Sequence, residues 1–229
     1  MFDYSQLDKN TVEAKGQLKD TELVRFFNPE GKGKRIMFVG NSITLHGYRP
    51  KLGWYGEWGM AASAAEKDYV HLLMSRVQET DPDAAFCICQ VASWEMKYQD
   101  GRDQFSLFEN AHNFDADIIV LRYIENCPKL EFDSEAFRAE SRALFAWLDP
   151  SKKAKYVVAT SFWHHPGDPD LEILAKELNA PLVFLGDLGD LDEMKATGLF
   201  ASKGVSHHPG DLGMKNIADR IFPAMQQYL

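Results

Sequence analysis

Two short stretches of the sequence hold side chains that could cooperate in nucleophilic catalysis. Ser42 lies in the glycine-led turn at 40–44 (GNSIT), directly after an apolar run, where its hydroxyl can point out from the edge of a sheet. Backbone N–H groups of such a turn can face a developing oxyanion. His207 and His208 precede Pro209 near the C-terminal end of the chain. Because a serine nucleophile needs a general base whose pKa suits neutral pH, these stretches predict acyl transfer by a serine–histidine pair.

The elements that must bring these stretches together can be predicted from the apolar pattern. Short runs rich in β-branched and aromatic residues predict strands at 35–40, 85–91, 117–123, 156–162 and 182–186. Helical patterns lie between and after them, at 63–79, 134–148, 171–178 and 211–229. Each predicted strand is nearly continuous in apolar residues, which is typical of strands buried on both faces of a parallel sheet. The alternation predicts a doubly wound α/β/α sandwich with a five-stranded, mainly parallel sheet.

The domain limits follow from the same pattern. Residues 1–34 are polar and mixed and end in NPEGKGK, so we expect a surface arm there and one α/β domain over 35–229. Within that domain, Ser134 is expected to cap the helix that starts beside it, and Pro223 is expected to kink or split the last helix.

Polar, chemically capable residues follow every predicted strand. In open parallel sheets, ligands bind beyond the carboxyl ends of the strands, so these residues should share one rim of the sheet. In chain order they are Asn41 and Ser42, Ser93 to Glu95, Glu125 and Asn126, Trp163 to His165, and finally His207 and His208.

Composition and charge exclude several classes of partner. The 229 residues are 45% hydrophobic, and 25 Lys and Arg face 34 Asp and Glu, a net charge of −9. This acid excess argues against nucleic acid and anionic membranes as partners. The chain lacks both a long apolar span and the apolar core of a signal peptide, so we expect a cytoplasmic protein. Its three cysteines are expected to be reduced, buried thiols.

Three blocks of the sequence, in order, resemble those of the SGNH hydrolases, also called GDSL esterases. They are GNSIT (40–44), with Asn41 in place of the usual Asp, IIVLRYIEN (118–126) and HHPGDLGM (207–214). The resemblance implies that Ser42 is the nucleophile and that His208, which precedes the proline, is the general base. It also implies that the Asn126 side chain and the Ser42 backbone N–H donate to the oxyanion.

Two departures from the family pattern concern the oxyanion donors. The third block usually has glycine two residues before the asparagine, and Ile124 stands there. The second block usually supplies a glycine N–H, but CQVASWEM (89–96) has no glycine. A backbone N–H of Ser93, Trp94 or Glu95 could replace it, because any residue other than proline offers one. The sequence does not decide among the three.

A third departure concerns the partner of the histidine. The family usually places Asp three residues before the catalytic His, and Val205 stands there. Without a carboxylate, the tautomer of His208 must be fixed in another way. Either a backbone carbonyl orients the ring of a Ser–His dyad, or a distant acid does. We favour the dyad; Asp211, the nearest acid that follows, is expected to cap the last helix.

Aromatic residues near the nucleophile suggest the substrate class. Trp54 and Trp58 lie in the long, glycine-punctuated segment 46–63, and Trp163 follows a predicted strand. These rings could bind a sugar ring or form an apolar wall over the site. The alternative is that they pack the loop onto the core. A carbohydrate esterase that removes acetyl groups fits such a rim, whereas a lipase would need a more continuous apolar surface.

These patterns favour a serine esterase that cleaves a short-chain acyl ester of a small molecule or saccharide, without a cofactor. The alternative is a non-catalytic ligand- or carbohydrate-binding module on the same scaffold. A metal-dependent hydrolase is disfavoured, because the adjacent histidines at 164–165 and 207–208 point in different directions and no recognised metal motif accompanies them. The sequence therefore predicts no metal site, and it carries no signal for an oligomeric state.

Overall fold

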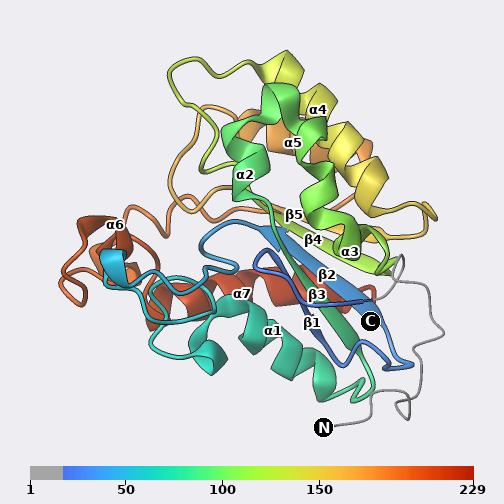
Figure 1. The fold of residues 1–229 in the computed structure, drawn as a ribbon, viewed down its shortest axis with the longest axis horizontal. Helices are drawn as coiled ribbons and strands as arrows, with labels where there is room; N and C mark the ends of the chain where they lie inside the picture. The colour runs from blue at the N-terminus through green and yellow to red at the C-terminus, as the bar shows by residue number, and fades with distance from the viewer. Residues whose placement is uncertain (1–17) are drawn as a thin grey trace, which may run out of the picture.

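A six-stranded, mostly parallel sheet forms the centre of the protein. The computed structural model describes residues 18–229. The strands follow the spatial order β1-β3-β2-β4-β5-β6, and only β1 runs antiparallel to its neighbour (Figure 1). Their bounds are Val24–Phe27 (β1), Arg35–Gly40 (β2), Ala85–Gln90 (β3), Ile118–Arg122 (β4), Lys155–Ala159 (β5) and Leu182–Val183 (β6). The prediction of a doubly wound α/β sandwich is confirmed, with six strands instead of five.

The additional strand lies inside the segment that the sequence assigned to a surface arm. Val24 is buried and pairs with Cys89 on β3, and Phe27 pairs with Phe86. The arm prediction was therefore wrong for 24–27. The strand was missed because it has only four residues, one of them charged, and its pairing partner lies more than fifty residues away. Residues 1–17 of the predicted arm lie outside the described part of the chain.

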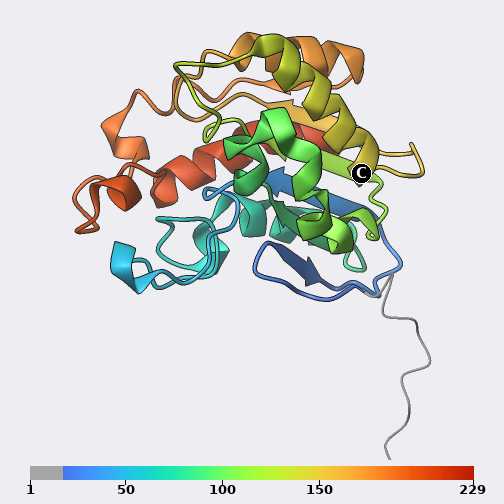
Figure 2. The same cartoon turned by 45° about the horizontal axis from the view of Figure 1, so that its top comes forward.

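Long helices cover both faces of the sheet. Helices α1 (Tyr69–Gln78) and α7 (Asp211–Gln226) lie on one face, and α4 (Ser134–Leu148) and α5 (Asp168–Glu177) lie on the other, as Figures 1 and 2 show. Successive residues of β2 point into different layers: Phe38 packs with the first pair of helices and Val39 with the second. Burial on both faces explains why the strands read as continuous apolar runs.

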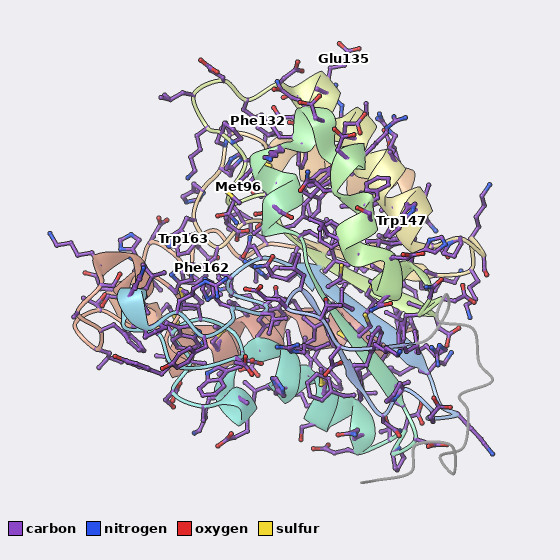
Figure 3. The ribbon with its side chains drawn as sticks, viewed as in Figure 1. Met96, Phe132, Glu135, Trp147, Phe162 and Trp163 are labelled. Carbon is purple, nitrogen blue, oxygen red and sulfur yellow. The ribbon has the colours of Figure 1, made fainter. Side chains whose placement is uncertain are left out.

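Shorter helices connect these layers. Two of them, α2 (Ala92–Met96) and α6 (Lys203–Ser206), lie near the carboxyl ends of the parallel strands. Figure 3 shows Met96, Phe162 and Trp163 toward that end, with Trp147 at the other. In residues 18–229, no helix is long and apolar enough to cross a bilayer. The remaining short helices are α3 (Glu109–His112), η2 (Pro50–Leu52), η3 (Ala65–Lys67), η4 (Tyr98–Phe108) and η5 (Asp192–Met194).

Helix boundaries differ in detail from the sequence predictions. Helix α4 has the predicted bounds, but its cap is Asp133, whose carboxylate accepts from the N–H groups of the first turn, while Ser134 donates to Asp170. Helix α7 runs through Pro223 as one element, so the expected split does not occur. The proline lies in the last turn, and the buried side chain of Met225 holds that turn on the core.

The cysteines agree with expectation. Cys87, Cys89 and Cys127 are all buried and free of disulfide bonds. Burial raises the pKa of each thiol, so all three stay protonated at neutral pH. They are therefore core residues with little nucleophilic character.

Candidate active site

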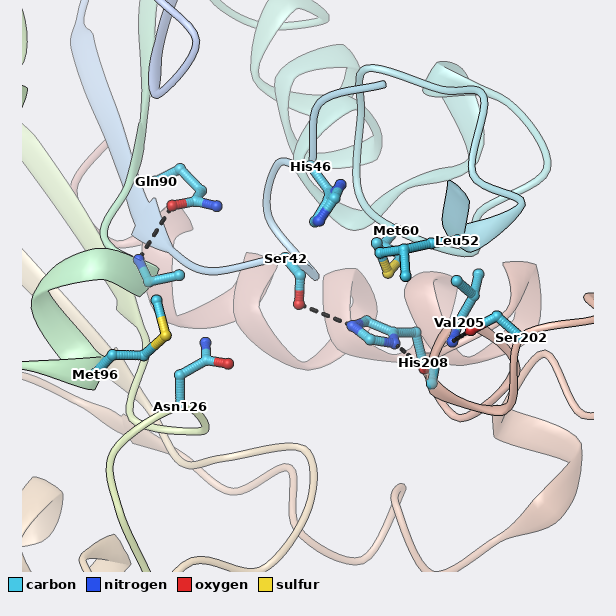
Figure 4. A pocket seen from close by; sticks show the side chains of 12 residues that line it. Ser42, His46, Leu52, Met60, Gln90, Met96, Asn126, Ser202, Val205 and His208 are labelled. Atoms are coloured by element: carbon cyan, nitrogen blue, oxygen red, sulfur yellow. Dashed lines mark hydrogen bonds between the residues drawn. The ribbon is translucent and has the colours of Figure 1, made fainter. Parts of the chain in front are cut away.

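The two residues proposed for catalysis meet at the carboxyl end of the sheet. Ser42 follows β2 in a tight turn, in which the Asn41 carbonyl accepts from the N–H groups of Thr44 and Leu45. His208 lies in the segment between α6 and α7. Ser42 Oγ and His208 Nε2 are 2.8 Å apart (Figure 4). The fold thus brings together side chains 166 positions apart, at hydrogen-bond distance for proton transfer.

The other nitrogen of His208 faces a backbone carbonyl. Nδ1 lies 2.7 Å from the carbonyl oxygen of Gly204. Because a carbonyl can only accept, Nδ1 carries the proton and donates, which leaves Nε2 free to accept from Ser42. Val205, at the position of the family's usual acid, is 1% exposed and packs in an apolar cluster. The arrangement is that of a dyad oriented by the main chain.

Asn126 is held in place by a buried carboxylate. Glu95, on α2, is 0% exposed and accepts from the Asn126 side-chain amide at 2.5 Å and from the Asn126 backbone N–H at 3.1 Å. The same carboxylate accepts from the N–H of Ile124 at 2.7 Å and from the side chain of Asn41 at 3.0 Å. Glu95 therefore ties the loop after β4 to the nucleophile turn.

An ion pair continues this network under the site. Arg122, the last residue of β4, is 0% exposed and donates to Glu125 at 2.5 Å and to the Asn41 side-chain oxygen at 2.6 Å. Glu125 in turn accepts from the Phe162 N–H at 3.0 Å, which connects the loop after β5 to the same network. This buried network, formed by Asn41, Glu95, Arg122, Glu125 and Asn126, fixes the ends of several strands relative to each other.

The two buried carboxylates differ in their charge. Burial and the neighbouring Glu125 raise the pKa of Glu95 from 4.5 to about 7. Burial acts in the same direction on Glu125, but the Arg122 guanidinium and several hydrogen bonds outweigh it and lower the pKa of Glu125. Glu125 is thus the ionised partner of Arg122, and Glu95 is the carboxyl that titrates near neutral pH.

A pocket opens beside the serine–histidine contact (Figure 4). Its volume is about 380 Å³, and most of its wall is apolar. The lining residues are Ser42, His46, Leu52, Met60, Gln90, Ala92, Met96, Asn126, Ser202, Gly204, Val205 and His208. A mostly apolar cavity with a few polar groups is the usual form of a small-molecule site. All three residues assigned to catalysis from the sequence line it.

Comparison with solved structures places this architecture among known folds. No protein-family model and no curated protein sequence matches the chain. A GDSL-like lipase from Parabacteroides merdae superposes with a TM-score of 0.59 at 16% identity, over 86% of this chain and 97% of the lipase. The chain has the SGNH hydrolase fold.

Two further structures share the SGNH fold with this chain. An α/β hydrolase from the metagenome of Lake Arreo, Spain, has a TM-score of 0.54 at 16% identity, over 87% of this chain and 98% of its own. A two-domain esterase active on acetylated mannans has a TM-score of 0.55 at 16% identity, over 88% of this chain. This chain spans half the length of that esterase.

The structure describes the two segments in which the sequence departs from the SGNH pattern near the expected oxyanion donors. Ile124, which stands in place of the usual glycine, has φ of +111°, a conformation that costs a β-branched residue about 1–3 kcal/mol. In the second block, Gln90, Ala92 and Met96 line the pocket, and the Ala92 N–H donates to the Gln90 side chain at 3.1 Å. This N–H was not among the three that the sequence suggested.

The tryptophans lie around the pocket without lining it. Trp54 is 2% exposed and packs edge-to-face on Trp58, so the predicted sugar-binding role of Trp54 is wrong in this conformation, because its ring is covered by the loop. Trp58 is half-buried and also packs within the loop. Trp163 meets the His208 ring edge-on at a centroid distance of 5.2 Å. For Trp58 and Trp163, a substrate-binding role stays a prediction.

Several residues of the site escaped the sequence analysis. Glu125 was recognised only as a polar residue at a strand end, and Glu95 as that and as one of three possible backbone N–H donors. Arg122 was read as part of a strand, and His46 was given no role. Helical spacing gives no sign that Glu95 is buried. A charged residue in an apolar run, as at Arg122, is the one signal that could have indicated a buried ion pair. Among residues 18–229, no group of three side chains is placed to hold a metal ion.

The pKa of His208 leads to a testable pH dependence. Burial, only partly offset by the Gly204 carbonyl, lowers the pKa of His208 from 6.5 to about 4. Because the base acts only when unprotonated, we expect kcat/KM for an ester to stay level down to about pH 5 and to fall by half near pH 4. The measurement is the pH profile of kcat/KM with p-nitrophenyl acetate.

Glu95 is the group that could obscure this profile, because its pKa of about 7 lies within the same range. The profile is therefore measured also for Glu95→Gln, which cannot titrate at that position. An acid limb near pH 4 in the variant agrees with the prediction. A limb with its midpoint at pH 6 to 7 in the variant contradicts it.

Proposed function

We propose that this chain is a serine esterase that removes a short acyl group from a neutral ester. The observation that carries the proposal is the 2.8 Å contact between Ser42 Oγ and His208 Nε2 at the wall of the pocket. The Gly204 carbonyl supports it by fixing the histidine tautomer in which Nε2 is the acceptor. The shared fold with GDSL-type esterases and lipases adds support of a general kind.

In the proposed reaction, Ser42 attacks the acyl carbonyl while His208 accepts the hydroxyl proton. The Ser42 N–H and the Asn126 side-chain amide donate to the developing oxyanion, since one hydrogen of that amide is left when the other binds Glu95. His208 then returns the proton to the departing alcohol oxygen. Water attacks the resulting acyl-enzyme by the same sequence in reverse order, releasing the acid and free Ser42.

We propose an acetylated or similarly short-chain acylated carbohydrate as substrate. The pocket has room for a small acyl group and part of an alcohol, and the net charge of −9 disfavours anionic substrates. The two-domain esterase with the same fold is active on acetylated mannans. This proposal needs no cofactor, because both nucleophile and base are side chains of the chain.

Covalent labelling tests the proposal directly. A fluorophosphonate probe should form an adduct at Ser42, read as a mass increase on the peptide that contains it. The Ser42→Ala variant should show no adduct, and Ser151→Ala, which removes an exposed serine in a turn, should label as the unmodified protein does. Absence of an adduct at Ser42 in correctly folded protein would contradict an activated serine.

A second candidate is a non-catalytic carbohydrate-binding module on the same fold. It is favoured by the engagement of the Ala92 N–H with Gln90, because this donor is then unavailable to an oxyanion. Sugar binding by calorimetry, with neither probe labelling nor ester turnover, would support the binding module over the esterase.

A further inference from the structure

His46 is a polar group of the pocket that the proposed dyad chemistry does not use. It lines the pocket together with Ser42, Leu52 and Met60. Figure 4 shows His46 and His208 on one side of Ser42, and Gln90 and Asn126 on the other. The His46 ring thus faces the half of the pocket opposite the proposed oxyanion donors.

The loop after the nucleophile holds His46 firmly. Its backbone N–H donates to the Trp58 carbonyl at 2.9 Å, and its own carbonyl accepts from the Trp54 indole N–H at 3.2 Å. The two indoles also pack edge-to-face on each other. Trp54 and Trp58 therefore act on the pocket indirectly, by fixing the backbone that carries His46.

The ring of His46 offers the pocket a hydrogen-bond acceptor. Nδ1 lies 2.7 Å from the Gly47 carbonyl, which can only accept, so Nδ1 carries the proton. Burial is the main cause of a lowered pKa of His46, so the ring is neutral at pH 7. Nε2 is then an unprotonated acceptor, and it has no hydrogen-bond partner in the described part of the chain.

The position of this acceptor relates it to the alcohol of an ester. His208 must return its proton to the leaving oxygen, so the alcohol departs on the side of Ser42 where His208 lies. His46 lies on that same side. A hydroxyl on the carbon adjacent to the one that bears the ester oxygen would come within reach of His46, between the apolar side chains of Leu52 and Met60.

We infer that His46 is a specificity-determining residue whose Nε2 accepts a hydrogen bond from a free hydroxyl beside the ester. The inference rests on the proposed esterase function and deepens it. The substrates selected are partial esters of polyols and sugars that keep a hydroxyl next to the acylated oxygen. An ester of a simple alkanol cannot make this hydrogen bond and leaves the His46 acceptor unpaired. We therefore expect a lower kcat/KM for such an ester.

The test compares two esters in the same enzyme preparation. Glycerol 1-monoacetate has the neighbouring hydroxyl, and propyl acetate lacks it. We expect the unmodified protein to favour the glycerol ester in kcat/KM, and His46→Leu to lower this ratio about tenfold, the effect of one hydrogen bond. His46→Gln, which retains an acceptor, should restore part of the ratio. His164→Leu, at an exposed histidine outside the pocket, should leave the ratio unchanged.

Each outcome separates the inference from the proposed function. Because the readout is a ratio within one preparation, loss of folded enzyme alone does not move it. Ser42-dependent hydrolysis of both esters with equal kcat/KM, or an unchanged ratio in His46→Leu, would overturn the role of His46 while leaving the esterase in place. Hydrolysis of neither ester, in a protein that also fails to label at Ser42, would overturn the proposed function itself.

Discussion

Replacement of Ser42 by alanine is expected to lower kcat for p-nitrophenyl acetate by about 10⁴-fold or more, the range measured when a nucleophilic serine is removed. The reason is the geometry of the dyad: Ser42 Oγ is 2.8 Å from His208 Nε2, and alanine has no group for His208 to activate. The expected effect is on kcat, because the pocket wall that binds the substrate stays intact. Steady-state kinetics with purified protein measure it.

The matched control is Ser151→Ala, which removes an exposed hydroxyl in a turn. It should hydrolyse the ester at the rate of the unmodified protein. Residual activity of Ser42→Ala within tenfold of that rate would contradict a nucleophilic Ser42. Thermal unfolding curves of both variants show whether a loss of rate arises from a loss of structure.

The variant Glu95→Gln is expected to lower kcat by about a hundredfold, the scale of one misplaced oxyanion donor. The carboxylate accepts from four donor groups, two of them in Asn126, and a carboxamide must turn an N–H toward at least one of these donors. The same conflict should reduce the free energy of unfolding by about 2 kcal/mol, because buried donors lose their acceptor. Steady-state kinetics and urea unfolding at pH 8, where Glu95 is ionised, measure both effects.

A double-mutant cycle with Asn126→Ala shows whether Glu95 acts through Asn126. If it does, the two losses in kcat overlap, and the double variant is little worse than the more damaged single variant. Losses that multiply would show that Glu95 has no positioning role toward Asn126. Glu135→Gln, at an exposed glutamate of α4, is the matched control and should change neither rate nor stability.

The elements buried on both sides were predictable from the sequence. The strand expected at 35–40 and the helix expected at 134–148 have those bounds, because their apolar pattern is strong and local. Strand β1 was missed because VRFF has only four residues in a polar segment, too few to show a pattern, and it pairs with a distant strand, β3. The predicted cap, Ser134, was wrong by one position, because Asp133 and Ser134 both have side chains that could accept from the first turn.

The part of the candidate site that could be predicted consists of residues whose type and motif indicate a catalytic role. Ser42, His208 and Asn126 were assigned from motifs, and the structure brings all three to one pocket. Glu95 and Arg122 could not be assigned, because their burial depends on contacts between segments far apart in the chain. The acceptor for His208 was foreseen as a backbone carbonyl, but no sequence pattern identifies which one, since every residue has a carbonyl.

A main-chain acceptor cannot be deleted by a point substitution. The carbonyl facing His208 belongs to Gly204, where an added Cβ would meet only Ser202 Oγ, at 3.6 Å. Where a carboxylate orients the imidazole, substitution of that single acidic residue removes the orienting group and severely lowers activity. Here, damage across a library of all single substitutions should instead be spread over the residues that set the course of the backbone, such as Ser202, which caps α6, and Pro209. The position of the orienting carbonyl therefore depends on the backbone conformation of the whole segment. Only substitutions that change this conformation should impair the orientation of His208.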